Sequence, residues 1–155
     1  MHCGNAPCVE ACFTGATYRL DDGIVRVDED KCIGCKACML ACPYGMRYFK
    51  PNVYFKAEPG AKGRPTIGRR IGLVEKCHFC MDRVHYGKPP ACVQACPTGA
   101  RVFGDIEDAE GEVARLVRQE GAWRLLGELD TDPAVYYIGV KPKTEWGLVP
   151  SVSSE

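Results

Sequence analysis

The stretch Cys32-Ile-Gly-Cys35-Lys-Ala-Cys38-Met-Leu-Ala-Cys42-Pro43 places four cysteines at the spacing C-x2-C-x2-C-x3-C-P. Three thiolates so close together can bind three iron corners of one cubane cluster, provided that the backbone turns tightly around it. Gly34 lies in the first of these turns and can adopt the φ that such a turn needs. The fourth cysteine is one helical turn further on and faces the other way, so it is predicted to bind a second cluster.

This spacing is the one found in bacterial ferredoxins, and two further cysteine groups flank it. The first is Cys3-x4-Cys8-x3-Cys12, and the last is Cys77-x2-Cys80-x11-Cys92-x3-Cys96-Pro97. The phrase that ends each group recurs at residues 11–16, 41–46 and 95–100. Such a repeat indicates a recurring structural unit, which we predict to be a ligand loop, a short helical turn and a following strand.

Other roles for the eleven cysteines fit the sequence less well. Disulfides are disfavoured by the odd count and by the C-x2-C-x2-C run. Zinc is an alternative for the last group, because Cys77-x2-Cys80 and Cys92-x3-Cys96 could supply four thiolates. No Cys–His–Asn set stands out as a catalytic thiol site. His2 and His78 adjoin cysteines, and we expect them beside the ligands or at the surface.

Composition and charge narrow the classes of partner. The 155 residues fit one compact domain, and 20 basic residues balance 20 acidic ones, so the basic footprint of a nucleic-acid-binding protein is absent. Residues 56–76 carry six basic and two acidic residues, whereas 105–132 carry nine acidic and three basic. These two segments are solvated faces or docking surfaces. The sequence shows no signal peptide and no stretch that would insert into a membrane.

Turn residues and periodicity predict the remaining elements. Thr17–Leu20 and Ile24–Asp28 flank an Asp-Asp-Gly turn and are predicted to form a hairpin. Strands are also expected at Arg47–Lys50 and Arg101–Gly104, and a final one at Tyr136 and Tyr137. Residues 51–75 are rich in Gly and Pro and are expected to form an exposed insertion. A helix is predicted from Asp108, its cap, to Glu120, with Gly121 as its stop.

Together these motifs resemble the iron–sulfur subunit of the dimethyl-sulfoxide-reductase and polysulfide-reductase type of molybdopterin oxidoreductases. The strongest matches are Cys77-His-Phe-Cys80-Met-Asp-Arg83 and residues 87–97, and the resemblance extends from His2 to about Ile138. Such subunits carry four cysteine groups, and this chain lacks the first. It also lacks the first cysteine of the family's second group, which corresponds here to Cys3, Cys8 and Cys12. We therefore expect an N-terminal truncation, with a genuine short paralogue as the alternative. Phe13 stands where the family usually has proline.

The resemblance implies how the cysteines pair. Cys12, Cys32, Cys35 and Cys38 would hold one complete [4Fe–4S] cluster. Cys3, Cys8 and Cys42 would supply three ligands of a second, which could persist as [3Fe–4S] or recruit another ligand. Cys77, Cys80 and Cys92 would belong to a third cluster, and Cys96 to a fourth, both incomplete in this chain.

The fold implied is α+β, dicluster-ferredoxin-like, pseudo-twofold and loop-rich, with short hairpins and short helices. Residues 1–104 would form the cluster-binding domain, and residues 105–155 a helix and strand extension packing on it. The resemblance implies an electron-transfer subunit without a substrate-converting site of its own. Its partners would be a molybdopterin catalytic subunit and a membrane-anchor, quinone-reactive subunit, which would hold it at the membrane. A stand-alone ferredoxin-like carrier and a zinc-stabilised interaction module are the alternatives.

Overall fold

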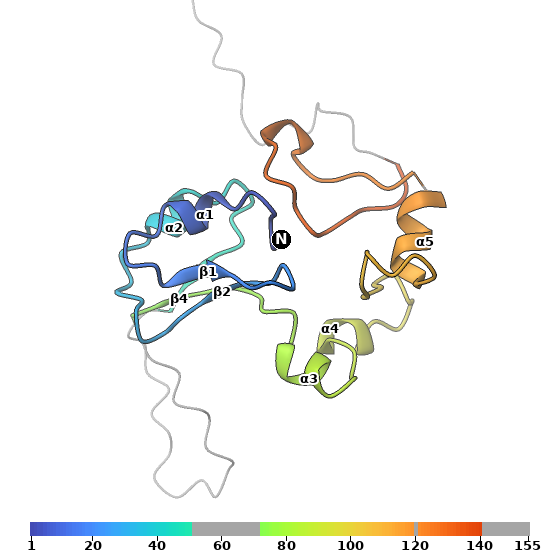
Figure 1. The fold of residues 1–155 in the computed structure, drawn as a ribbon, viewed down its shortest axis with the longest axis horizontal. Coiled ribbons are helices and arrows are strands. Elements are labelled where there is room, and N and C mark those ends of the chain that lie inside the picture. Colours follow the sequence, from blue (N-terminus) through green and yellow to red (C-terminus); the bar gives the residue numbers. More distant parts are fainter. Residues whose placement is uncertain (51–71, 120, 141–155) are drawn as a thin grey trace, which may run out of the picture.

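A computed structural model describes residues 1–50, 72–119 and 121–140 (Figure 1). Short helices and strands alternate along the described chain. The elements are α1 (Pro7–Glu10), β1 (Thr17–Arg19), β2 (Val25–Val27), α2 (Ala37–Leu40), β3 (Tyr48–Phe49), β4 (Val74–Glu75), α3 (Met81–His85), α4 (Ala91–Gln94), α5 (Glu112–Gln119) and a 3-10 turn, η1 (Gly127–Leu129). The expected mixture of small helices, small strands and long loops is confirmed.

The repeated cysteine phrase corresponds to a repeated backbone unit. The four-residue helices α1, α2 and α4 each end at the alanine that precedes a cysteine. Three residues after each cysteine, a glycine amide donates to the carbonyl of that cysteine, at 2.9, 3.2 and 3.3 Å. These glycines, at positions 15, 45 and 99, have φ of +66°, +61° and +66°. A residue with a Cβ rarely adopts this left-handed backbone conformation, which explains the glycine in every copy.

Two antiparallel hairpins follow the first two copies of the unit. In the first, β1 pairs with β2 in the register Thr17↔Val27 and Arg19↔Val25, and the turn ends at Gly23, which confirms the predicted hairpin. In the second, β3 pairs with β4. The prediction of an exposed insertion over residues 51–75 was therefore wrong at its C-terminal end, because Val74 lies in a strand and is only 2% exposed. Residues 51–71 of that insertion lie outside the described residues.

Two other expected elements differ from the structure. Residues 101–104 form no strand, so the third copy of the repeat lacks the strand that follows the first two. Helix α5 begins at Glu112, not at Asp108. The Asp108 carboxylate accepts a bond from the Glu110 amide at 3.2 Å and its carbonyl accepts one from Gly111 at 2.9 Å. Asp108 thus forms a turn before the helix instead of capping it. Gly121, with φ of +60°, follows the helix as predicted.

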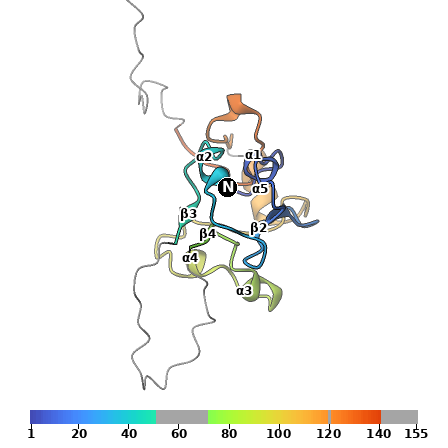
Figure 2. The same cartoon turned by 90° about the vertical axis from the view of Figure 1, so that its left-hand side faces the viewer.

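The segment from Trp123 to Val140 returns to the beginning of the chain (Figures 1 and 2). The amides of Gly4 and Asn5 donate to the carbonyls of Asp132 and Thr131, at 2.7 and 3.2 Å. Tyr137 forms an isolated β-bridge with Trp123, in place of the strand expected at Tyr136 and Tyr137. The return segment therefore covers the N-terminal residues that carry the first cysteine group.

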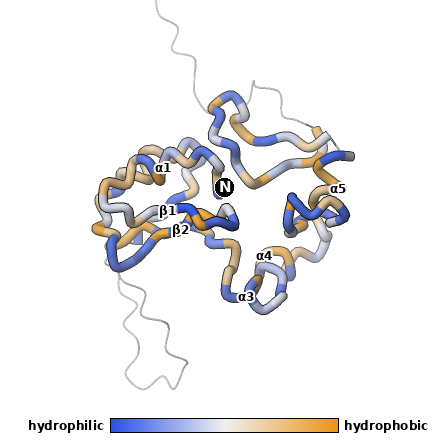
Figure 3. Tube along the Cα trace, in the orientation of Figure 1, coloured by the Kyte–Doolittle hydropathy of each residue, from blue (hydrophilic) through white to orange (hydrophobic). Residues whose placement is uncertain are grey.

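The buried core is small, and three of its seven members are cysteines. Its members are Cys3, Ala6, Cys8, Val25, Cys38, Tyr44 and Val74. Hydrophobic and hydrophilic segments alternate along the trace (Figure 3). Within the described residues, no helix has the length and apolar character to cross a membrane.

Candidate metal centre

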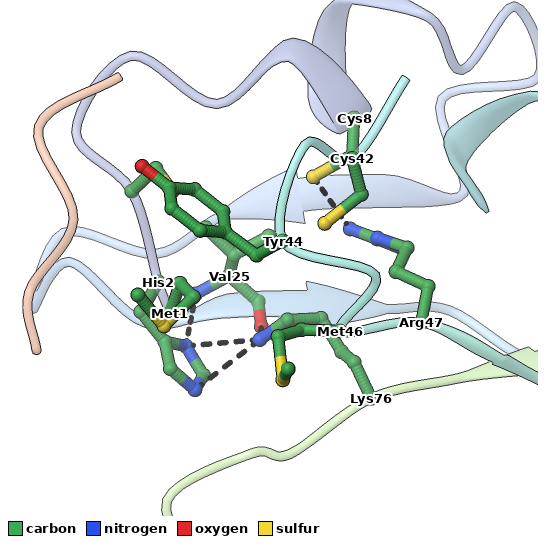
Figure 4. Close-up of a pocket in the computed structure, with 10 residues that line it drawn as sticks. Met1, His2, Cys8, Val25, Cys42, Tyr44, Met46, Arg47 and Lys76 are labelled. Atoms are coloured by element: carbon green, nitrogen blue, oxygen red, sulfur yellow. Dashed lines mark hydrogen bonds between the residues drawn. The ribbon is translucent and has the colours of Figure 1, made fainter. Parts of the chain in front are cut away.

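Three cysteines from separate segments line one cavity (Figure 4). Cys3 precedes α1, Cys8 lies within α1, and Cys42 follows α2. Cys3 and Cys8 are buried and Cys42 is half-buried. The remaining walls are Met1, His2, Val25, Tyr44, Met46, Arg47 and Lys76. The cavity thus gathers the three cysteines that were expected to share the second cluster.

Arg47 places a positive charge in the wall of this cavity. It is 4% exposed, and its Nη2 donates to Cys8 Sγ at 2.9 Å. Its Nη1 donates to Thr17 Oγ1 at 3.2 Å. A buried guanidinium is costly unless it is paired with acceptors or negative charge, and here Cys8 Sγ and Thr17 Oγ1 are the acceptors.

His2 and Lys76 form the opposite wall. Nδ1 of His2 accepts a bond from the Val25 amide at 3.0 Å, and the ring stacks on Phe79 at 3.9 Å between centroids. His2 is 3% exposed. Burial, with the Lys76 ammonium, lowers the pKa of His2 to about 2, so the ring is neutral. The sequence left two positions open for His2, beside a ligand or at the surface. Its burial excludes the surface.

Lys76 reaches into the same wall. Its Nζ donates to the carbonyls of Val25 and Cys77, at 2.8 and 2.7 Å, and lies 3.1 Å from Nδ1 of His2. Burial and the charge of Arg47 lower the pKa of Lys76 to about 8. Lys76 therefore adds a second basic side chain to the wall of the cavity, although burial disfavours its charged form.

The four cysteines expected to hold the complete cluster lie near α1 and α2. Cys12 follows α1, Cys32 and Cys35 precede α2, and Cys38 lies within α2. Burial opposes ionisation of Cys12, but bonds from the Thr17 amide (3.3 Å) and the Thr14 hydroxyl (3.6 Å) outweigh it and lower its pKa to about 7. Burial raises the pKa of Cys38, and the positive charge of Arg47 opposes that effect. Cys35 is exposed and Cys32 half-buried. The environments of these four thiols therefore differ before any metal is bound.

The last cysteine group is more open. Cys77 and Cys92 are exposed, and Cys80 and Cys96 are half-buried. Arg83 connects α3 with residues 89–94, because its side chain donates to the Pro89 carbonyl at 2.9 Å and to the Gln94 side chain. Arg83 lies in α3 and Gln94 in α4, so this contact holds the two helices side by side (Figures 1 and 2).

The side chains that line the cavity of Cys3, Cys8 and Cys42 fit an iron–sulfur cluster. Nε of Arg47 is a buried donor without a hydrogen-bond partner among the described residues. Cluster sulfurs accept hydrogen bonds, and three thiols are at hand to bind iron. In the same part of the chain, no three His, Cys, Asp or Glu side chains are grouped for a single metal ion.

Sequence reasoning missed Arg47 and Thr17 as neighbours of the thiols. A signal was nevertheless present in the repeat. Thr17, Arg47 and Arg101 each stand five residues after the cysteine that ends a group. The structure brings the first two of these equivalent positions into hydrogen-bond contact. A polar residue recurring at a fixed distance from a ligand is the pattern that could have identified them.

Comparison with known proteins agrees with this chemistry. Residues 1–57 and 64–106 match the 4Fe-4S dicluster domain family. Among curated relatives, the chain is 45% identical to a protein of Halobacterium salinarum described as a candidate iron-sulfur subunit of a dimethyl sulfoxide reductase, over 94% of this chain and 56% of that protein. It is 40% identical to a selenate reductase subunit of Mesobacillus selenatarsenatis, over 89% and 52%.

A third relative is the thiosulfate reductase electron transfer subunit PhsB of Salmonella typhi, which is 43% identical over 80% of this chain and 55% of that protein. The chain spans about half the length of the curated relatives it matches. The family match covers all eleven cysteines and all three copies of the repeat. This chain therefore belongs to the 4Fe-4S dicluster domain family.

Proposed function

We propose that this chain transfers electrons through [4Fe–4S] clusters as the iron–sulfur subunit of a molybdopterin oxidoreductase complex. The observation that carries the proposal is the convergence of Cys3, Cys8 and Cys42 on a cavity that also holds a buried guanidinium. A cluster with thiolate ligands is negatively charged, so a cation and spare N–H donors stabilise it. The names of the relatives, among them an electron transfer subunit, support the same function.

We assign the ligands in sets. Cys12, Cys32, Cys35 and Cys38 hold one complete cluster. Cys3, Cys8 and Cys42 provide three ligands of a second, as [4Fe–4S] with a further ligand or as [3Fe–4S]. Cys77, Cys80 and Cys92 contribute to a third, and Cys96 to a fourth. The shared cavity supports the second set, and the cubane spacing of 32–38 supports the first.

The protein's own groups set the conditions for transfer. A bound cluster passes one electron at a time. The Thr17 amide and the Thr14 hydroxyl bond to Cys12 Sγ and stabilise its thiolate. Tyr44 and Val25 are buried and line the cavity of the second set, so they reduce its contact with solvent. No step of substrate conversion is assigned to this chain.

The chain is proposed to consist of a cluster-binding domain and an extension that packs on it. Residues 1–104 act as the cluster-binding domain with pseudo-twofold halves, and residues 105–155 as an extension. The backbone bonds from Gly4 and Asn5 to Asp132 and Thr131 support this packing. We propose a molybdopterin catalytic subunit and a membrane-anchor, quinone-reactive subunit as partners, through which the chain is held at the membrane.

Metal analysis of the complete chain, reconstituted without oxygen, tests the function. Iron, acid-labile sulfide and zinc are measured on one sample. About four irons with equal sulfide indicate that only the complete site fills, and clearly more indicate that the incomplete sites also fill. Zinc without sulfide would refute the electron-transfer proposal in favour of a zinc-stabilised module. Purification of an iron-loaded chain with no affinity for a catalytic subunit would favour a stand-alone carrier.

A further inference from the structure

A chain of hydrogen bonds joins the ligands of the first two proposed clusters. Nη2 of Arg47 donates to Cys8 Sγ, and its Nη1 donates to the Thr17 hydroxyl. The amide of Thr17 in turn donates to Cys12 Sγ at 3.3 Å. Cys8 and Cys12 belong to different ligand sets, so one guanidinium connects both.

From this geometry we infer that Arg47 is a shared tuning residue, whose buried charge raises the reduction potentials of both clusters at once. The inference rests on the proposed function and goes beyond it, because it names the residue that couples the two sites. Arg47 acts on the clusters through Cys8 and Thr17 and takes no part in the electron transfer itself.

The direction of the effect follows from charge. Reduction adds one negative charge to a cluster, and a nearby positive charge stabilises the reduced form more than the oxidised one. Hydrogen bonds to the sulfurs and local net charge are the protein's means of setting the potential. Arg47 provides both, and at 4% exposure its field is only weakly screened by solvent.

Arg47 is better placed for this role than the other cation at the cavity. The ammonium of Lys76 is directed to the carbonyls of Val25 and Cys77. Among the described residues, Arg47 is the charged side chain that has a hydrogen bond to a cysteine sulfur. Its Nε lacks a protein partner in the same residues and can donate to a cluster sulfur.

The test is a redox titration, followed by electron paramagnetic resonance, of the complete reconstituted chain and three variants. Arg47→Gln removes the charge, and Arg47→Lys keeps it. Arg115→Gln removes an exposed charge on α5, a helix that carries no cysteine, and serves as the matched control. Iron and sulfide contents are measured on every sample, so that cluster loss is distinguished from a shift in potential.

In Arg47→Gln, both potentials are expected to fall, with the larger fall at the Cys3, Cys8 and Cys42 site. There the one-electron equilibrium constant should change roughly tenfold, which is about 59 mV. Arg47→Lys should shift less, and Arg115→Gln should match the wild type. Unchanged potentials in Arg47→Gln, a shift at one site only, or an equal shift in Arg115→Gln would overturn the inference. A wild-type chain without iron and sulfide would instead refute the proposed function.

Should Arg47→Gln fail to retain clusters, Thr17→Val decides. Valine has nearly the shape of threonine, and the backbone amide that bonds to Cys12 is kept. This variant leaves the bond between Arg47 and Cys8 and the charge of Arg47 beside Cys38 in place, and it removes the hydroxyl that links Arg47 to Thr17. The potential of the Cys12 site is expected to fall while the other changes less. Equal potentials in Thr17→Val and wild type would overturn the inference that Arg47 acts on the Cys12 site through Thr17.

Discussion

A Cβ on Gly34 would lie 1.9 Å from the carbonyl oxygen of Gly72. Gly34 lies between Cys32 and Cys35 and has φ of +69°. Gly72 precedes β4, and its amide donates to the Lys50 carbonyl at 2.8 Å, so its backbone is held in place by the second hairpin. The cysteine loop and the strand backbone therefore touch at a point where only glycine fits.

Substitution Gly34→Ala should destabilise the iron-loaded chain by roughly 2 kcal/mol or more, because alanine meets both the clash and the left-handed φ. For a chain of this size, that corresponds to a fall of roughly 4–8 °C in the thermal midpoint. The midpoint is followed by the visible absorbance of the clusters.

Gly127→Ala is the matched control for this substitution. A Cβ on Gly127 would have no heavy atom within 4 Å, and Gly127 does not have a positive φ. Its midpoint should stay close to that of the wild type. Equal midpoints for the two variants would contradict the contact between the cysteine loop and Gly72.

Removing the Tyr44 hydroxyl should loosen the return segment. Tyr44 Oη donates to the Leu125 carbonyl at 3.3 Å and is hydrogen-bonded to the Thr131 hydroxyl. Tyr44→Phe leaves these groups without their partner, at a cost of about 1–2 kcal/mol. The amides of Gly4 and Asn5, which donate to the same segment, should exchange hydrogen faster. Tyr86→Phe, at an exposed tyrosine, should leave their exchange unchanged.

The buried His2 ring should make stability fall with acid. Burial and Lys76 lower its native pKa to about 2, against 6.5 for a free ring. Below pH 6.5 the unfolded chain binds a proton that the native chain does not, so stability decreases as the pH falls. The slope approaches about 1.4 kcal/mol per pH unit. Above pH 6.5 both states are neutral, and the contribution is constant.

His2→Asn should reduce this slope between pH 7.5 and 5.5, measured by denaturant unfolding at each pH. Asparagine can accept a bond from the Val25 amide in place of Nδ1 and has no group that titrates in this range. His85→Asn, at an exposed histidine, should keep the wild-type slope. Parallel slopes for His2→Asn and wild type would contradict a neutral buried ring.

Cysteine variants should separate the proposed ligand sets. Cys38→Ser removes a ligand of the complete site and should lower the iron content by about four per chain. Cys42 belongs to the set of Cys3 and Cys8, so Cys42→Ser should leave the cluster of the complete site in place. Iron and acid-labile sulfide are determined after reconstitution. An equal loss of the same cluster in both variants would show that the sets are assigned wrongly.

Local patterns in the sequence predicted the repeated units well. The cysteine spacing indicated the cluster family, which the family match confirms. The Asp-Asp-Gly turn predicted the hairpin of β1 and β2 correctly. Both signals are local, because turn geometry and ligand spacing depend on a few consecutive residues. The ligand sets stay a prediction.

Elements that depend on distant contacts were predicted less well. Val74 was expected in an exposed insertion, but pairing with β3 buries it. One local element also differed: Asp108 was expected to cap a helix and instead forms a turn four residues before α5. Residues 101–104 follow a cysteine as β1 does, yet have no strand. Sequence similarity between repeats does not supply the partner strand that a sheet needs.

The sequence by itself determined the cysteine spacing, the glycines at positive φ and the hairpin turn, since each is a property of neighbouring residues. Only the tertiary structure decided which groups meet around the thiols. Arg47 contacts Cys8 across 39 positions of the chain, and Tyr44 contacts Thr131 across 87. Such contacts depend on how the repeats and the return segment pack together, and burial then gives the charge of Arg47 its strength.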